Sequence, residues 1–576
     1  MQEEKLNMMI EYVSGELLKK RPEDGSLWTG YLSSSAISTS VAVFALHISG
    51  TERHQSLIKN GVDWLKKTML DDGSWGDSPE SPSNMTATLL TFATLSAVGQ
   101  TPEKTKAFLK NKFNGISDQD IITGVLNYYG KDLTFSAPIL VMCALAGVIS
   151  SWKNIPQLPF ELSVLPQKLF RFLRLPVVSY AIPALIAVGI LRYKKGSRNL
   201  LRERFISGAL KVLLKLQPKH GGFLEAAPLT GFVAMCMCGA GYGDHEAVRK
   251  GIGFLTDTVR KDGSWPIDTN LAAWVTSLSV RAIGENIPDR LNLANNIRQN
   301  AFKYQHPFTG AKEGGWGWTN LPGAAPDADD TSGALVALHQ LSNGEMSLEV
   351  KKGLEWILSL QNSDGGIPTF CKGWGKLPFD RSSPDITAHA LLAFSLWRVQ
   401  LPNELQTKCD KGARRMLLWM KKEQSNEGCW YPLWFGDQDA KDERSPVYGT
   451  ALSVEYLAGI DHPIAKEIVA KGAAYLLKCQ NADGGWGGAK GVSSKVTLTA
   501  RALSALSTLD QIEQSVLDKA FDFLYLKYET KELLKPEPIG LYFARLWYSE
   551  DMYNITFALN ALNNYKKKLS RTKIIT

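Results

Sequence analysis

Residues 471–486 read KGAAYLLKCQNADGGW, a helical segment followed by the turn that ends it. The apolar residues of the segment have helical rather than alternating spacing. Glycine can end a helix in the left-handed conformation, and the tryptophan after it can pack over the turn against the next helix. The side chain of Gln480 can hydrogen-bond exposed backbone groups at neighbouring helix ends. The stretch therefore predicts a helix hairpin closed by Gln480 and Trp486.

Related copies of this stretch occur along most of the chain. In the C-terminal half they recur at intervals of roughly 50 to 60 residues, which is enough for two helices and a turn. The segments between them are apolar with helical periodicity, and no convincing series of strands is present. The sequence therefore predicts an all-α protein of helix hairpins closed into α/α barrels. The tryptophans of the turns are interpreted as structural: Trp75, Trp265, Trp316, Trp430 and Trp486.

Length and composition limit the class of protein. A chain of 576 residues is too long for one ordinary core, and 44% hydrophobic with 21% charged residues is typical of globular domains. The 16 Trp, beside 22 Phe and 18 Tyr, indicate an aromatic-lined cavity. The net charge of +8, without an arginine-rich block, does not indicate nucleic acid as a partner but is compatible with an anionic membrane surface.

The cysteines and the N-terminus indicate the compartment. The seven cysteines are scattered, and Cys236 and Cys238 have no histidine at ligand spacing, so reduced cytosolic thiols are expected rather than a zinc site. The first five residues open a charged amphipathic helix rather than a signal peptide. Both observations predict a chain that faces the cytoplasm.

Two stretches without charged residues, 133–152 and 175–191, interrupt the repeats. A transmembrane hairpin is one interpretation, but the second run is short and prolines interrupt both. Long uncharged helices also occur buried inside barrels. The mixed basic and apolar character of residues 156–190 favours a monotopic segment that dips into one leaflet. We therefore expect contact with the cytoplasmic face of a membrane through the region of about 133–191.

A cluster of three carboxylates precedes the apolar run 333–338. Residues 326–332 read PDADDTS, which places Asp327, Asp329 and Asp330 within four positions. Acidic residues cap helices well, but one cap needs only one carboxylate. Crowding raises at least one pKa, so that a protonated carboxylic acid can persist near neutral pH. The cluster is therefore a candidate proton donor.

Three motifs together resemble the squalene–hopene cyclase family of class II terpene cyclases. These motifs are the Gln…Asp-Gly-Gly-Trp repeats, Asp327-Ala328-Asp329-Asp330-Thr331 and Asp385-Ile386-Thr387-Ala388-His389, and the resemblance runs from Trp75 to Tyr565. It implies two α/α barrels with a central apolar cavity between them. Residues 1–20 would form a helix that packs on the C-terminal barrel, 21–290 a barrel with the membrane-contact segment, and 291–576 the catalytic barrel. Ile367, where Trp is usual, and residues 540–548 depart from the family pattern.

The resemblance also assigns the acid chemistry. Asp329 would be the donor that protonates an alkene, while Asp327 and Asp330 hold the protons and the orientation of the cluster. A His389 imidazolium, held by Asp385, would favour the carboxylate that the donor becomes. Asp385 and His389 are four residues apart, so they share one helical face.

Aromatic faces can stabilise a migrating carbocation without trapping it. The resemblance suggests as substrate-binding residues Trp274, Trp318, Phe370, Trp434, Tyr448, Phe543 and Trp547, with Phe379 a weaker candidate. No metal or other cofactor is expected, because residues 330–333 lack the third carboxylate of the Asp-Asp-x-x-Asp magnesium motif. Initiation is therefore expected by protonation rather than by loss of diphosphate.

The resemblance favours an isomerase-type cyclase that closes rings in a linear polyprenoid such as squalene. A shorter prenyl diphosphate or an aromatic-headed meroterpenoid is the alternative substrate. A zinc-dependent prenyltransferase-like barrel and a non-catalytic binding module are lesser alternatives. The expected partners are the apolar polyprenoid, a membrane surface and, by the resemblance, a second copy of the chain in a homodimer.

Overall fold

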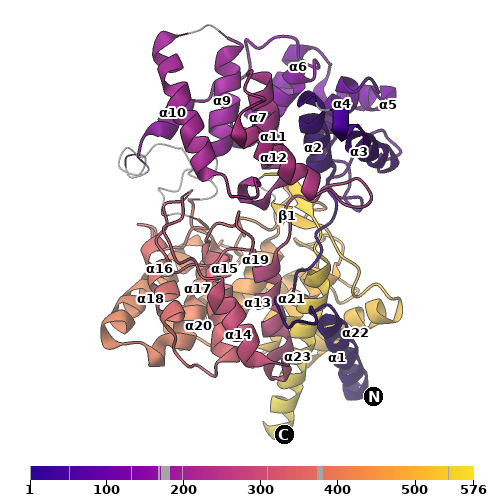
Figure 1. Ribbon diagram of the computed structural model, residues 1–576. Helices are drawn as coiled ribbons and strands as arrows, with labels where there is room; N and C mark the ends of the chain where they lie inside the picture. Colours follow the sequence, from indigo (N-terminus) through magenta and orange to yellow (C-terminus); the bar gives the residue numbers. More distant parts are fainter. Residues whose placement is uncertain are drawn as a thin grey trace.

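The computed structural model describes residues 2–50, 52–130, 133–166, 169, 182–196, 199–307, 309–370, 372, 380–541 and 544–575. The chain forms two helical lobes, one above the other in Figure 1. Each lobe has its own hydrophobic core, and the two cores meet at few side chains such as Trp434. The predicted all-α class is confirmed, and the lobes are the α/α barrels.

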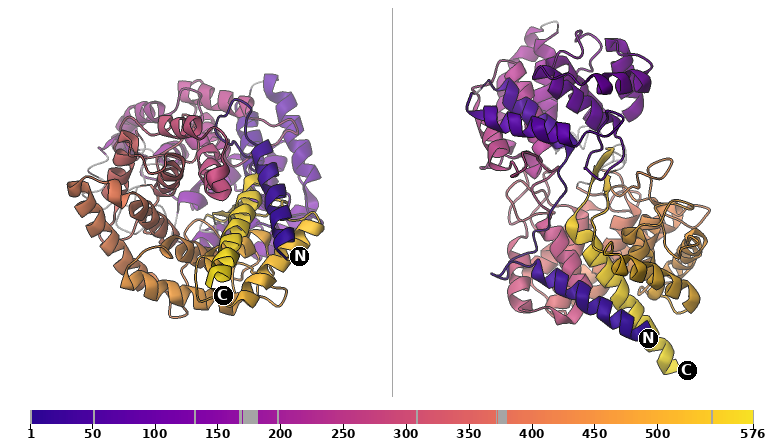
Figure 2. Two further views of the ribbon diagram at one scale, coloured as in Figure 1. Left: turned by 90° about the horizontal axis from the view of Figure 1, so that it is seen from below. Right: turned by 90° about the vertical axis from the view of Figure 1, so that its right-hand side faces the viewer.

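The lower lobe is a closed double ring. Its inner ring consists of α13 (Ala272–Ile283), α15 (Ala328–Leu341), α17 (Pro384–Trp397), α19 (Pro446–Leu457), α21 (Val496–Ser507) and α23 (Asp551–Ile575). Each inner helix packs on the next, and α23 returns to α13. The outer helices are α14 (Arg290–Gln299), α16 (Leu348–Leu360), α18 (Asn403–Glu423), α20 (Pro463–Cys479) and α22 (Gln514–Glu529). Figure 2 shows this ring end-on.

The N-terminal helix α1 (Gln2–Lys19) takes the remaining outer place, against α22 and α23. Its buried face consists of Leu6, Met9, Val13 and Leu17, at the spacing of one helical stripe. The chain therefore closes its C-terminal barrel with its own first helix (Figure 2).

The upper lobe repeats the plan. Its inner helices are α2 (Ala36–Ile48), α4 (Met85–Ala97), α7 (Leu133–Leu145), α9 (Ile182–Lys194) and α11 (Ala227–Gly239). Its outer helices are α3 (Gln55–Lys67), α5 (Glu103–Phe113), α6 (Asp118–Tyr129), α10 (Leu200–Leu216) and α12 (Glu246–Asp257). The short antiparallel hairpin of β1 (Ile539–Leu541) and β2 (Leu546–Tyr548), which the sequence did not predict, lies between the lobes (Figure 1).

The division between the cores differs from the predicted boundary at residue 290. The upper core ends at Trp265, and the lower core begins again at Ala272 and also contains Leu27, Trp28 and Leu32. The reason is that α13 closes the inner ring between α15 and α23, so it belongs to the lower barrel.

The repeated turns have the same hydrogen bonds in both lobes. Gln480 Nε2 donates to the carbonyls of Gly484 (2.9 Å) and Val516 (3.0 Å), which ties a turn to the next outer helix. The indole of Trp486 donates to the carbonyl of Leu476 at 2.8 Å, and its backbone N–H donates to Thr499 Oγ1 at 3.0 Å. The same indole bond is made by the other structural tryptophans, Trp75, Trp265, Trp316 and Trp430. The threonine is a further member of the repeat that sequence reasoning missed, and in one copy it is Thr331 of the acidic motif.

No helix among the described residues is both long and apolar enough to cross a membrane. The first uncharged run contains α7, whose residues from Ser136 to Cys143 are all buried in the upper core. That run therefore forms an inner barrel helix, and the proline inside it, Pro138, is buried too. Of the expected membrane segment, residues 167–168 and 170–181 lie outside the described residues.

Candidate active site

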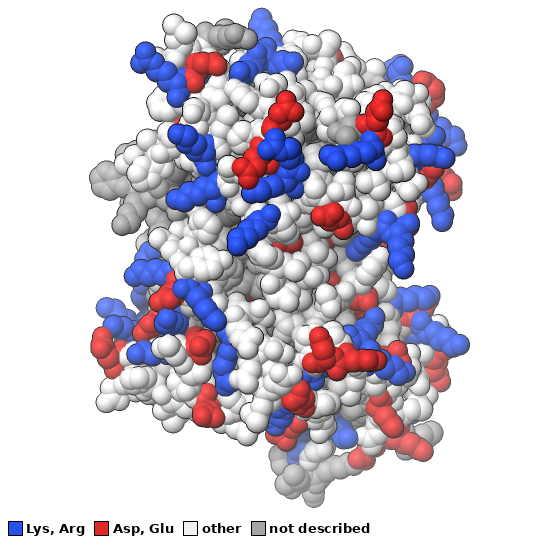
Figure 3. All heavy atoms as spheres, in the orientation of Figure 1, with Lys and Arg blue, Asp and Glu red and all other residues white. Residues whose placement is uncertain are grey.

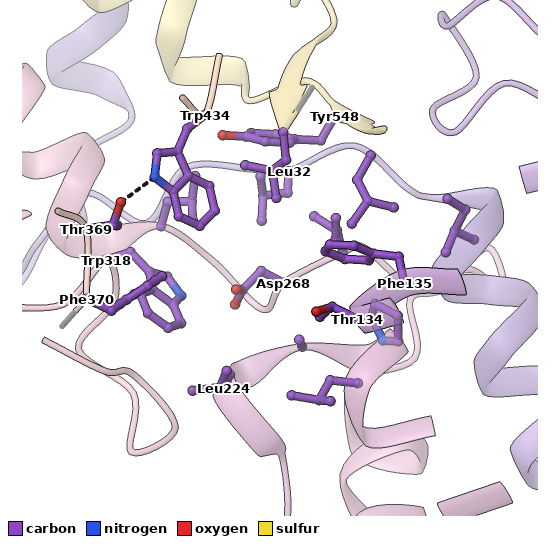
Figure 4. A pocket seen from close by; sticks show the side chains of 18 of the residues that line it. Leu32, Thr134, Phe135, Leu224, Asp268, Trp318, Thr369, Phe370, Trp434 and Tyr548 are labelled. Atoms are coloured by element: carbon purple, nitrogen blue, oxygen red, sulfur yellow. Dashed lines mark hydrogen bonds between the residues drawn. The ribbon is translucent and has the colours of Figure 1, made fainter. Parts of the chain in front are cut away.

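A cavity of about 370 Å³ lies between the two barrels, within the size range of small-molecule sites. Its wall is mostly apolar and comes from both lobes and from the β1–β2 hairpin (Figure 4). Four carboxylates face it: Asp268, Asp327, Asp329 and Asp330. Within the described part of the chain no Lys, Arg or His lines it. In Figure 3 the face of the molecule shows few charged side chains where the lobes meet.

The acidic motif forms the start of α15. Asp327 is the N-cap, and its Oδ1 accepts the backbone N–H groups of Asp329 (3.0 Å) and Asp330 (2.9 Å). The backbone N–H of Asp327 in turn donates to the carbonyl of Trp316 at 2.9 Å. The capping interpretation therefore applies to Asp327, and the side chain of Asp329 takes no part in the cap.

Burial makes this cluster bind protons. The pKa of Asp327 rises to about 7, mainly because the side chain is buried, with the charge of Asp329 as a smaller cause. Burial, followed by the charge of Asp327, raises the pKa of Asp330 well above its usual value. The residues Asp327 and Asp330 are 3% and 8% exposed, whereas the side chain of Asp329 is 23% exposed. Asp329 is thus the carboxyl of the motif that is most open to the cavity.

His389 contacts Asp329 directly. Its Nδ1 lies 2.6 Å from Asp329 Oδ1, across the gap between the inner helices α17 and α15. The imidazole side chain is only 3% exposed. A short, buried contact of this kind can stabilise the carboxylate that Asp329 becomes when it gives up a proton.

The expected role of Asp385 as the holder of His389 differs from what the structure shows. Asp385 Oδ1 accepts a 2.5 Å hydrogen bond from Ser383 Oγ, and among the described residues no hydrogen bond joins Asp385 to His389. Both residues lie on one face of α17, but Asp385 is in its first turn and bonds to the residue that precedes the helix. Burial, with the charge of Asp329 second, raises the pKa of Asp385 to about 7.

A stack of side chains that sequence reasoning missed holds the imidazole instead. The ring of Tyr456 lies 4.6 Å from that of His389 with only 17° between their planes. Arg281 lies over Tyr456 at 4.6 Å, and its Nη2 contacts Glu455 Oε1 at 2.8 Å. Burial opposes ionisation of Glu455, but Arg281 and then Arg501 outweigh it and lower its pKa. The sequence signal that could have found this stack is a charged residue inside an otherwise apolar helix, as Arg281 is in α13 and Glu455 is in α19.

The predicted aromatic residues divide into three groups. Trp274, Trp318, Phe370 and Trp434 line the cavity, and Phe370 meets Trp318 and Trp434 edge-on at 6.2 and 5.7 Å. The indole of Trp434 is fixed by a 2.7 Å bond to Thr369 Oγ1 (Figure 4). Tyr448 and Trp547 are buried and do not line the cavity. Phe543, like Phe379, lies outside the described residues. Lining aromatics that were missed include Tyr129, Phe135, Phe232, Phe435, Tyr548 and Tyr553.

Comparison with protein families agrees with this geometry. Residues 290–567 match the model of the squalene–hopene cyclase C-terminal domain, and residues 19–158 match that of the prenyltransferase α/α toroid domain. The chain belongs to the squalene–hopene cyclase family. The relatives that it matches are named as terpene cyclases, among them squalene–hopene cyclases and an ent-copalyl diphosphate synthase. In the described residues, no group of three His, Cys, Asp or Glu side chains is placed to hold a metal ion.

The individual proteins to which the chain is similar are distant from it in sequence. A probable squalene–hopene cyclase of Sinorhizobium fredii is 22% identical over 90% of this chain and 90% of its own length. The enfumafungin synthase of Hormonema carpetanum is 24% identical over 80% of this chain, and the match spans only 40% of that protein. The ent-copalyl diphosphate synthase structure from Streptomyces platensis aligns over 97% of this chain and 99% of its own, at 16% identity and a TM-score of 0.57, and so supports the fold.

Proposed function

We propose that this cyclase acts on a linear, uncharged polyprenoid of the squalene type and protonates its terminal alkene from Asp329. The observation that carries the proposal is the cavity wall, where an acid faces an apolar, aromatic surface. A prenyl diphosphate would bring several negative charges into a cavity with four carboxylates and, in the described part of its wall, no basic side chain. The charge pattern therefore favours the hydrocarbon over the diphosphate.

Proton transfer proceeds from the Asp329 carboxyl group to one carbon of the terminal alkene. The alkene π electrons form the new C–H bond, and a tertiary cation remains at the other carbon. The carboxylate left on Asp329 is stabilised by His389 at 2.6 Å and by its position in the first turn of α15, at the positive end of the helix. Both groups stabilise charge that appears only during the transfer, which is how a site lowers a barrier.

The cation then meets the aromatic wall. Trp318, Phe370 and Trp434 form a continuous series of edge-to-face rings beside the cavity, and Trp274 lies between the cavity and His389. Each aromatic face contributes about 0.5 to 2 kcal/mol to a nearby cation. The wall therefore stabilises successive cations without supplying a nucleophile.

The proposal includes uptake of the substrate from a membrane. Leu200, Leu201 and Phe205 at the start of α10 are 86%, 67% and 41% exposed, next to the expected membrane segment. Exposed apolar side chains of this size beside basic residues are typical of a monotopic contact. Attachment to the cytoplasmic face and a homodimer remain predictions, which fractionation of cells and mass photometry would test.

A substrate panel tests the proposal. The purified protein is incubated in detergent with squalene, geranylgeranyl diphosphate and a prenylated phenol, and the products are identified by mass spectrometry. We expect a cyclic isomer or hydrate of squalene, absent from the Asp329→Asn variant. Turnover of the diphosphate or the phenol without turnover of squalene would contradict the proposed substrate class.

A further inference from the structure

A carboxyl group that the proposed protonation does not use lies in the cavity wall. Asp268 belongs to the connection between α12 and α13, which joins the two barrels. Figure 4 shows its side chain in the space between Trp318 and Phe135, pointing into the pocket. It comes from a different element than Asp327, Asp329 and Asp330, which all belong to the start of α15.

A buried glutamate holds Thr269, the residue that follows Asp268. Asp268 Oδ1 accepts the backbone N–H of Thr269 at 2.8 Å. The same N–H also reaches the carbonyl of Glu225 at 3.1 Å, and the Thr269 hydroxyl donates to Glu225 Oε2 at 3.2 Å. Glu225 is 1% exposed, and its Oε1 accepts the backbone N–H of Gly323 at 2.6 Å. The contacts fix the cavity loop to the upper barrel.

The backbone around Glu225 is strained. Leu224 and Glu225 have φ of +55° and +58°, a conformation that residues with a side chain rarely adopt. Such strain persists only where surrounding contacts hold it. In this backbone conformation Leu224 lines the cavity and the Glu225 carboxylate contacts Thr269.

Glu225 connects the cavity to the surface. His220 Nε2 lies 2.7 Å from Glu225 Oε1, and the His220 side chain is 32% exposed. Thr269 lies between Asp268 and Glu225, with its backbone N–H on Asp268 Oδ1 and its hydroxyl on Glu225 Oε2, and His220 continues from Glu225 to solvent. Glu225 and His220 are in contact and can pass a proton, and the Thr269 hydroxyl, on the residue next to Asp268, is the group that would carry it from Asp268 to Glu225.

Asp268 and Asp329 have different surroundings. His389 Nδ1 lies 2.6 Å from Asp329 Oδ1, where it can hydrogen-bond the carboxylate that remains after proton transfer. Burial first, and then the negative charge of Glu225, raise the pKa of Asp268 well above its usual value, which favours uptake of a proton. Once it has lost its proton, a carboxylate in such an environment is a stronger base than an exposed one.

We propose that Asp268 is the base that ends the cyclisation, and that Glu225 and His220 return the proton to solvent. In this step a C–H bond next to the final cationic carbon breaks and its electron pair becomes a C=C bond. The proton goes to a carboxylate oxygen of Asp268. One proton enters from Asp329 and one leaves to Asp268, so the product is an isomer of the substrate. The inference rests on the proposed function and adds how the cascade terminates.

The first test is Asp268→Asn, assayed on a polyprene that the wild-type protein converts. An amide keeps the shape but accepts a proton poorly. We expect substrate consumption within about tenfold of wild type, while the share of the wild-type alkene falls at least about tenfold. Alkenes from loss of another proton, or alcohols from capture by water, replace it. The matched control is Asp257→Asn, an exposed aspartate at the end of α12, which leaves the products unchanged.

Two results would overturn the inference. One is an unchanged product distribution in Asp268→Asn. The other is loss of substrate consumption in a variant that melts like wild type, because that places Asp268 in initiation. Failure of the wild-type protein to convert any polyprene counts instead against the proposed function.

A second variant keeps the test decisive if Asp268→Asn fails to fold. His220→Gln, at a partly exposed position, is expected to lower kcat about tenfold with KM unchanged, and added imidazole restores the rate. His245→Gln, a change to a histidine on the same barrel, serves as the control. A His220→Gln enzyme as fast as wild type, or a slow one that imidazole does not rescue, would contradict the proton route.

Discussion

The imidazole of His389 lies flat against the ring of Tyr456, with ring centroids 4.6 Å apart and planes 17° from parallel. This contact turns Nδ1 toward Asp329, at 2.6 Å, without help from Asp385. The orientation of the His389 ring beside Asp329 is therefore set by helix α19, which carries Tyr456, and by Arg281 of α13 behind it.

Replacement of Tyr456 tests this relationship. Tyr456→Phe keeps the aromatic face and is expected to retain kcat within about threefold, whereas Tyr456→Leu is expected to lower kcat at least about tenfold with little change in KM. The reason is that a misaligned imidazole stabilises the Asp329 carboxylate less well. Steady-state kinetics measures both values, with melting temperatures to exclude unfolding. Equal kcat values for the two variants would show that the stack has no role.

Asp327 and Asp329 of the acidic motif are expected to respond differently to amide substitution. Asp329→Asn removes the transferable proton and should lower turnover by at least about 10³-fold. Asp327→Asn retains an N-cap residue for α15, so we expect the helix to persist and turnover to fall much less. Product formation under single-turnover conditions compares them. A more severe loss in Asp327→Asn would move the donor to that residue.

Stability should fall as pH rises toward neutrality. Burial raises the pKa of both Asp327 and Asp385 from 3.8 to about 7, so in the folded state each binds a proton that the unfolded chain releases near pH 3.8. Between these values the folded state holds more protons than the unfolded state, and the free energy of unfolding decreases with rising pH. Above about pH 7 this contribution is constant.

Asp385→Asn isolates one of these groups. The variant cannot ionise at this position, so its melting temperature should fall less than that of wild type between about pH 5 and about pH 7. Asp257→Asn, exposed on α12, should follow wild type. If the melting temperatures of Asp385→Asn and wild type changed in parallel with pH, Asp385 would be ionised throughout this range.

The sequence predicted what is encoded locally. The turn at Gln480 and Trp486 recurs along the chain, and each copy specifies one connection between two helices. The barrels could therefore be predicted from short stretches of sequence. The acidic motif and His389 were found because their residue types are unusual before apolar helices. Tyr456 and Arg281 were missed because their contacts with the site join different inner helices, α19, α17 and α13. Trp547 was expected in the cavity wall but does not line it. It belongs to a hairpin whose strands have only three residues, which is too short for an alternating pattern to be recognised in the sequence.

Membrane attachment can be tested at the exposed start of α10. Leu200 and Leu201 are 86% and 67% exposed, and their replacement by glutamate should weaken binding to vesicles of anionic lipids, because burying a charge in the bilayer costs free energy that burying leucine gains. Leu348→Glu is the matched control, since Leu348 is 62% exposed but begins the outer helix α16 of the other barrel. Vesicle flotation measures the bound fraction. We expect the double variant Leu200→Glu, Leu201→Glu to lose most of the binding of wild type and Leu348→Glu to retain it, while cyclase activity in detergent stays unchanged in both. If the bound fraction were the same for all three proteins, the start of α10 would not be the membrane-contact surface.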